Sequence, residues 1–172
     1  MNNIHAFNQN KEIIKDLNAI DSLKDFFKDI IERRYSFWSK KKEELQDRNK
    51  YFTEILNSSI KFKNRVNKYN PEKKEIYIEK IDKNIDFVNQ RLVKVNDLIK
   101  MINNKLSKNK DSINAIIGNY IKENKMKARN ESLKLYDTVK IETDRNNQIS
   151  SILTKYHNKI IQPGIDMIVN FI

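Results

Sequence analysis

The clearest pattern along the chain is a run of branched aliphatic residues separated alternately by three and four positions. The run comprises Ile78, Ile81, Ile85, Val88, Leu92, Val95, Ile99, Ile102 and Leu106. Because these steps average 3.5 residues, the nine side chains lie on one narrow face of an α-helix. A face this apolar must be buried against other helices, so the region is predicted to belong to a bundle or coiled coil.

Similar but less regular spacing predicts two further long helices, at residues 22–69 and 112–162. Asp21 or Ser22 is expected to cap the first of them. Its apolar face includes four residues seven apart and is interrupted by polar side chains between residues 39 and 50. In the last helix the nearly all-polar stretch at residues 122–132 could fray or bend.

Turn residues divide these helices. Asn70 is expected to cap a helix over residues 71–106, with Pro71 in its first turn, where no amide donor is needed. Asp111 or Ser112 is expected to cap the third long helix. Pro163 and Gly164 are expected to end it, leaving an apolar tail at residues 163–172.

The predicted fold class is all-α, because the chain has only 2 Gly and 2 Pro and therefore few places for hairpin turns. The connection at Asn70 is so short that the helices on either side are expected to be antiparallel neighbours. We therefore predict one helical domain over residues 1–172. It would be an elongated antiparallel bundle of three long helices with coiled-coil-like packing, preceded by a short helix within residues 1–20.

Candidate catalytic chemistry is sparse. The chain has no cysteine, which excludes disulfides and thiolate metal sites, and its two histidines, His5 and His157, have no metal-ligand partner at helical spacing. No glycine-rich phosphate loop or nucleophile elbow is present in the sequence. We expect no enzyme activity, no metal, no cofactor and no small-molecule substrate.

The net charge of +11 favours an anionic partner such as nucleic acid, an acidic membrane surface or an acidic protein. A hairpin about Asn70 would bring together basic residues from both of its helices and from the following turn. The predicted polyanion site comprises Arg33, Arg34, Lys40, Lys41, Lys42, Lys105, Lys108 and Lys110. The alternative is a solvated bundle end whose lysines only keep the protein soluble. A second basic stripe, Lys61, Arg65 and Lys68, shares one helix face near the other end.

The apolar C-terminal tail needs its own explanation. Its candidate partner-binding residues are Ile165, Ile168, Val169, Phe171 and Ile172. The tail is too short to span a bilayer. It could cap the bundle, dock into a partner's groove or insert shallowly into a membrane.

The function predicted from these patterns is that of a non-enzymatic α-helical interaction protein, an adaptor or structural subunit acting by helix-face recognition. The alternatives are a nucleic-acid-binding module that uses the basic bundle end and, less favoured, a protein that binds acidic membranes. Protein partners are expected, and a homo-oligomer is compatible with the pattern. The chain begins without a secretory signal, so a cytoplasmic location is the expectation.

Overall fold

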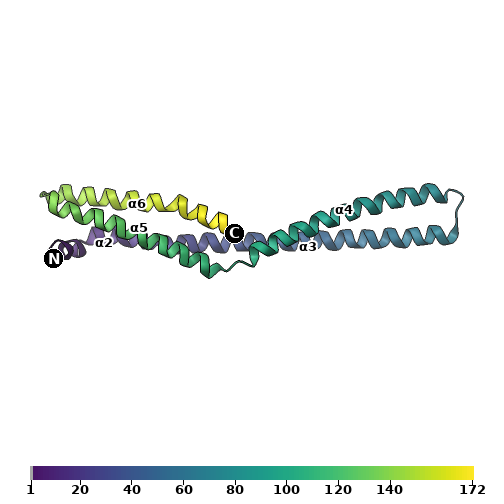
Figure 1. The fold of residues 1–172 in the computed structure, drawn as a ribbon, viewed down its shortest axis with the longest axis horizontal. Coiled ribbons are helices and arrows are strands. Elements are labelled where there is room, and N and C mark those ends of the chain that lie inside the picture. The colour runs from purple at the N-terminus through teal and green to yellow at the C-terminus, as the bar shows by residue number, and fades with distance from the viewer. Residues whose placement is uncertain (1) are drawn as a thin grey trace. The chain divides into compact units, whose positions relative to one another are not determined.

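The computed structural model describes residues 2–172, and these form six α-helices and no β-strand (Figure 1). This confirms the predicted all-helical class. The helices are α1 (Asn2–Gln9), α2 (Lys11–Asp21), α3 (Leu23–Tyr69), α4 (Lys74–Leu106), α5 (Lys110–Thr138) and α6 (Glu142–Phe171).

The helices form two compact units. Unit 1 contains the described residues up to Arg34 together with Lys108–Ile172, and unit 2 contains Tyr35–Ser107. Unit 2 therefore consists of most of α3 and all of α4, while unit 1 contains the other helices. The predicted single bundle of three long helices is not confirmed, because the residues expected to form one third helix form both α5 and α6.

Unit 1 surrounds its core with several helices. The helices α5 and α6 run side by side (Figure 1), and α2 packs against both of them. The most deeply buried apolar side chains come from every helix of the unit: Phe7, Ile13, Ile20, Phe27, Ile31, Ile113, Ile117, Ile121, Ile149, Leu153, Ile160, Ile168 and Ile172. Helices from several parts of the chain therefore contribute to one core.

The polar stretch at residues 122–132, where the sequence suggested fraying or bending, lies inside the continuous helix α5. Its side chains Asn124 and Ser132 are buried, and each donates a hydrogen bond to a carbonyl of its own helix, Tyr120 and Ala128 respectively. Small residues that satisfy their polar atoms within the helix let neighbouring helices approach closely. The chain reverses later, at Val139 and the two residues after it.

The helix α6 continues through Pro163 and Gly164, so the predicted separate tail at residues 163–172 is wrong. Proline inside a helix removes one hydrogen bond and costs about 3 kcal/mol. Continuing the helix buries Ile168 and Ile172 almost completely, and Gly164 lies directly against the buried ring of Phe27. This non-local burial outweighs the local cost of the proline.

Unit 2 is a two-helix hairpin (Figure 1). Its register is marked by contacts between α3 and α4. Asn49 Nδ2 donates to Asn96 Oδ1 at 2.7 Å, Asn84 Nδ2 donates to Ser59 Oγ at 2.9 Å, and Lys63 pairs with Asp82 at 2.6 Å. Within it, Leu45, Val95 and Ile102 form an apolar cluster, joined by half-buried side chains that include Trp38 and Phe52.

The turn between α3 and α4 differs from the expected one. Asn70 has a φ of 48° and its amide donates to the Val66 carbonyl at 3.0 Å. It therefore ends α3 in the left-handed conformation that asparagine adopts more readily than other non-glycine residues. The helix α4 begins three residues later than predicted, after Lys73, which makes no side-chain cap hydrogen bond.

Two other predicted caps are also wrong. Asp21 and Ser22 belong to the end of α2 instead: Ser22 has helical backbone angles and its Oγ donates to the Ala19 carbonyl, while Asp21 pairs with Lys125. Asn109, rather than Asp111 or Ser112, caps α5 by accepting from the Asp111 amide at 2.8 Å. In each case the identity of the capping residue depends on where the neighbouring helices end and begin, and sequence spacing does not specify that to the residue.

Candidate interaction surface

The predicted polyanion residues are divided between the two units. Arg33, Arg34, Lys108 and Lys110 belong to unit 1, while Lys40, Lys41, Lys42 and Lys105 belong to unit 2.

Several of these cations lie against neighbours within their own unit. Arg33 pairs with Asp29 at 2.8 Å, Lys41 with Glu44 at 3.1 Å and Lys110 with Glu32 at 2.9 Å. Surface pairs of this kind contribute roughly 0–1 kcal/mol each. They do reduce the positive potential that these three side chains present to an anion.

The two lysines nearest the end of α4 lie over aromatic rings. Lys105 Nζ is 5.0 Å from the centre of the Trp38 ring, and Lys108 Nζ is 5.5 Å from the Phe171 ring. Trp38 is half-buried against the apolar cluster of unit 2. Part of the Trp38 side chain therefore packs against α4 and the Lys105 side chain.

The predicted partner-binding residues form the last turns of α6. Ile168 and Ile172 lie in the core of unit 1, Ile165 and Phe171 are half-buried, and Val169 is exposed. Of the three roles considered for this segment, the structure places it as part of the core of unit 1.

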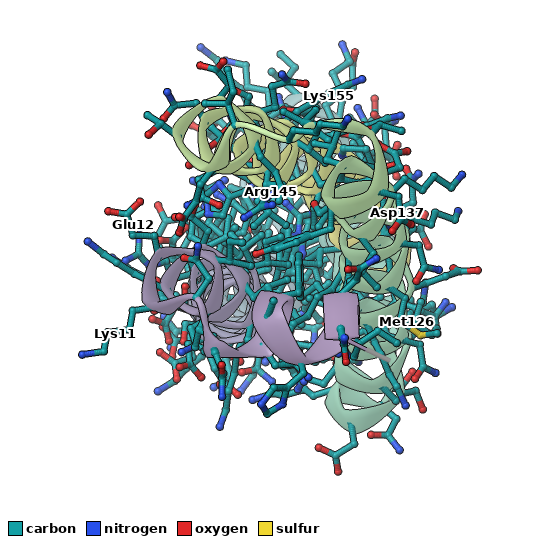
Figure 2. The ribbon with its side chains drawn as sticks, turned by 90° about the vertical axis from the view of Figure 1, so that its left-hand side faces the viewer. Lys11, Glu12, Met126, Asp137, Arg145 and Lys155 are labelled. Carbon is teal, nitrogen blue, oxygen red and sulfur yellow. The ribbon has the colours of Figure 1, made fainter. Side chains whose placement is uncertain are left out.

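The end of unit 1 nearest the viewer in Figure 2 is closed by stacked rings and cations. Phe7 meets Tyr136 edge to face at 6.0 Å, and the Arg145 guanidinium lies 4.1 Å from the centre of the Tyr136 ring. Figure 2 shows Arg145 directed between the helices, whereas Lys11, Glu12 and Lys155 point outward. This arrangement seals the end of the core.

A glutamate and a tyrosine in different units have shifted pKa values. The hydrogen bond that Tyr156 donates to the Glu131 carboxylate, together with its burial, raises the pKa of Tyr156 above its usual 10.0. The hydrogen bond from Lys83 lowers the pKa of the exposed Glu79 carboxyl. Both shifts follow from pairing with one neighbouring side chain, Glu131 for Tyr156 and Lys83 for Glu79.

Candidate catalytic groups remain scattered. His5 lies 2.9 Å from Gln9, and His157 lies beside Asn158 in a shallow hollow with Asp16 and Leu153. Among residues 2–172, no three histidine or carboxylate side chains are grouped so that they could hold a metal ion.

The most distinctive surface lies on the hairpin of unit 2. The nine-residue apolar run from Ile78 to Leu106, which we call the seam of α4, is covered on only one side. Its alternate residues Ile81, Val88, Val95 and Ile102 are buried, while the other five are half-buried. One helix, α3, is not wide enough to cover the whole apolar face.

The same hairpin exposes many large apolar side chains. On α4 they are Ile76, Tyr77, Phe87, Val93, Leu98 and Met101, and on α3 they are Phe37, Tyr51, Ile60, Phe62 and Tyr69. Phe62 and Tyr69, near the end of α3, are 53% and 74% exposed. In their place the stem of Lys63 and the side chain of Val66 turn toward α4.

A shallow groove follows α3 in this region. It is lined by Tyr51, Glu54, Ile55, Ser58, Ser59 and Phe62. Four of these, Tyr51, Ile55, Ser58 and Phe62, are separated by four, three and four residues, so they share one face of the helix. This spacing can be read in the sequence, but the prediction followed the apolar pattern of the adjacent face of α3. We call these four residues the α3 stripe.

A second hollow of unit 2 lies beside α4 and is acidic. Glu75, Glu79, Asp82 and Asp86 line it together with Ile78 and the neighbouring Lys74, Lys83 and Asn67. Two of the carboxylates are paired, Glu79 with Lys83 and Asp82 with Lys63, both at 2.6 Å. The hairpin therefore carries acidic as well as basic faces.

None of the helices in residues 2–172 combines the length and the apolar content that crossing a bilayer requires. In comparisons with protein-family models, curated proteins and solved structures, the chain matched none of them.

Proposed function

We propose that this protein is a non-enzymatic helical interaction protein, an adaptor or structural subunit that recognises partners through the faces of its helices. The observation that supports the proposal most is the half-covered seam of unit 2, with its large apolar side chains left in solvent. Scattered exposed apolar residues are ordinary on protein surfaces, but an array along one hairpin is typical of a binding surface.

The exposed face of α4 is the part of the hairpin that we assign to partner recognition. Phe87, Leu98 and Met101 are 50%, 44% and 44% exposed and recur at helical spacing along this face. Arg91 lies over the Phe87 ring at 4.9 Å, so the apolar residues are bordered by positive charge. A helix of another protein with an apolar stripe and acidic flanks has the matching chemistry.

The test is affinity capture of partners from native lysate with the tagged full chain, in nuclease-treated and untreated halves. We expect a stoichiometric protein that persists after nuclease treatment. Met101→Glu should lose this protein, because the change places a carboxylate on the proposed face. Met126→Glu is the matched control, since Met126 is a comparably exposed methionine (56%) on the outer side of α5 (Figure 2).

Two results would contradict the proposal. One is that no protein is captured at stoichiometric levels. The other is recovery of nucleic acid, with all associated proteins lost after nuclease treatment and with binding abolished by Lys105→Glu, Lys108→Glu and Lys110→Glu. That outcome, with affinity falling steeply as salt rises, would favour the alternative nucleic-acid-binding function.

A further inference from the structure

A column of charged residues borders the α3 stripe on its outer side. It consists of Asp47, Glu54, Lys61 and Lys68, which are separated by seven residues each and therefore lie in line along the helix. The first two are acidic and the last two are basic. The order of charges thus inverts at the middle of the column, between Glu54 and Lys61.

The α3 stripe is centred on nearly the same point. Tyr51 and Phe62, its two aromatic ends, are 60% and 53% exposed and lie equally far from the midpoint between residues 56 and 57. Ile55 and Ser58 lie next to that midpoint, one large and one small. The groove between them is open along the helix surface.

From this symmetry we infer that the α3 stripe binds the same stripe of a second copy of the chain in antiparallel orientation. A two-fold axis near residue 57 places Tyr51 of one copy opposite Phe62 of the other, and Ile55 opposite Ser58. Pairing a large side chain with a small one at each central position allows close packing between helices. The contacts repeat on both sides of the axis, as a two-fold interface requires.

The charged column identifies the occupant as a second copy of the chain. In the antiparallel arrangement Glu54 lies opposite Lys61 of the second copy and Asp47 opposite its Lys68, and the symmetry doubles both pairs. In antiparallel coiled coils, residues at the same flanking position of the two helices meet in this way. In a parallel arrangement the column would face the other flank of the second helix, where Phe52, Ser59 and Val66 are uncharged, so none of these ion pairs would form.

This inference concerns α3 and goes beyond the proposed function, which uses the opposite helix of the hairpin. It therefore has a separate readout, made on purified protein alone. A chain that dimerises but captures no other protein supports the dimer and contradicts the adaptor role. A chain that stays monomeric but captures another protein supports the adaptor role and contradicts the dimer.

The first experiment is sedimentation equilibrium of the purified full chain over a range of concentrations. We expect a monomer–dimer equilibrium, with the dimer at twice the 20.6 kDa chain mass. Phe62→Glu should give a monomer at every concentration. Phe87→Glu should leave the dimer unchanged, since Phe87 is as exposed as Phe62 (50% against 53%) but lies on α4. Circular dichroism checks that both variants keep their helices.

The second experiment tests orientation by charge reversal. Glu54→Lys and Lys61→Glu should each weaken the dimer about tenfold, because each creates two like-charge contacts across the interface. The double variant should restore the wild-type affinity while keeping the wild-type net charge. The two positions are about 10 Å apart along one helix, so the restoration has to come from pairing between copies.

Several results would overturn the inference. They are a wild-type chain that remains monomeric, a dimer that survives Phe62→Glu, and an assembly larger than a dimer. Failure of the double charge reversal to restore affinity would overturn the antiparallel arrangement.

Discussion

Unit 1 buries its apolar residues between helices on several sides, whereas unit 2 has only two helices with which to cover an equally regular apolar face. The result is visible at matched residues. Ile160 of α6 is fully buried, while Ile85, one of the five half-buried residues of the seam of α4, is partly open to solvent. Regular hydrophobic spacing therefore indicates that a face needs covering, and the number of neighbouring helices decides whether the chain itself covers it.

The two units also differ in net charge. Unit 2 contains seventeen of the basic residues and ten of the acidic ones, so it carries +7 of the net charge of +11. The unit with the more open apolar surface is also the more basic one. A surface with both properties suits partners that present acidic, apolar helices.

The largest effect on the free energy of unfolding should come from truncating an isoleucine side chain in each unit. Ile160→Ala should lower the free energy of unfolding by about 3 kcal/mol, because it leaves a cavity in a closed core. Ile85→Ala should cost about 1 kcal/mol, since solvent already reaches that side chain. Urea unfolding followed by circular dichroism measures both. Equal losses would show that the hairpin is as well packed as unit 1.

The next test concerns the two glycines, both in helices of unit 1. A Cβ atom at Gly164 would lie 2.3 Å from the Phe27 ring, so Gly164→Ala should destabilise the protein by about 2 kcal/mol. Nothing lies within 4 Å of a Cβ atom at Gly118, so Gly118→Ala should stabilise it by about 0.5–1 kcal/mol. Thermal unfolding of both variants checks this. A stabilising Gly164→Ala would contradict the tight packing of α6 on α3.

A smaller effect is expected at Tyr156, whose hydroxyl donates to Glu131. Tyr156→Phe should cost about 1 kcal/mol at neutral pH. The raised pKa of Tyr156 means that the folded state holds the proton more tightly than the unfolded state. The bond should therefore stabilise the protein below pH 10, and its contribution should fall as the pH rises above 10. Urea titrations of wild type and variant should converge at alkaline pH, and a constant difference would contradict this.

The smallest expected effect lies at the turn of unit 2. Asn70 has a positive φ, which glycine adopts without strain and alanine does not. Asn70→Ala should cost about 1 kcal/mol, and Asn70→Gly should change the free energy of unfolding by no more than about 0.5 kcal/mol. Hydrogen exchange at the neighbouring turns of α3 and α4 would locate the change. Equal behaviour of the two variants would mean that the turn does not depend on this conformation.

Much of the secondary structure was predictable because it depends on local spacing. The start of α3 near residue 22, its end at Tyr69 and the end of α4 at Leu106 all follow from the patterns of apolar and turn residues. The division of the region after Ser107 was not predictable in this way. Its polar stretch was interpreted as a place where the helix could fray or bend, yet Asn124 and Ser132 bond to their own helix and are buried.

The candidate surface was only partly predictable. Tyr51 and Phe62 stand at helical spacing in the sequence, but their spacing does not reveal which of two adjacent faces of α3 meets α4. The basic residues around Arg34 and Lys108 were grouped from an assumed hairpin. The structure keeps these in unit 1 but assigns Lys40, Lys41, Lys42 and Lys105 to unit 2, and several of the eight cations lie against neighbours.

By itself the sequence determined that the chain is helical and which side chains share a face, because both depend on residues a few positions apart. Only the tertiary structure decided which faces are covered and where α6 ends. The helix passes Pro163 because residues distant in the chain, Phe27 among them, form the core that receives its last turns. Burial against distant residues is a sum over the whole fold, so it can override a local signal that costs only a few kcal/mol.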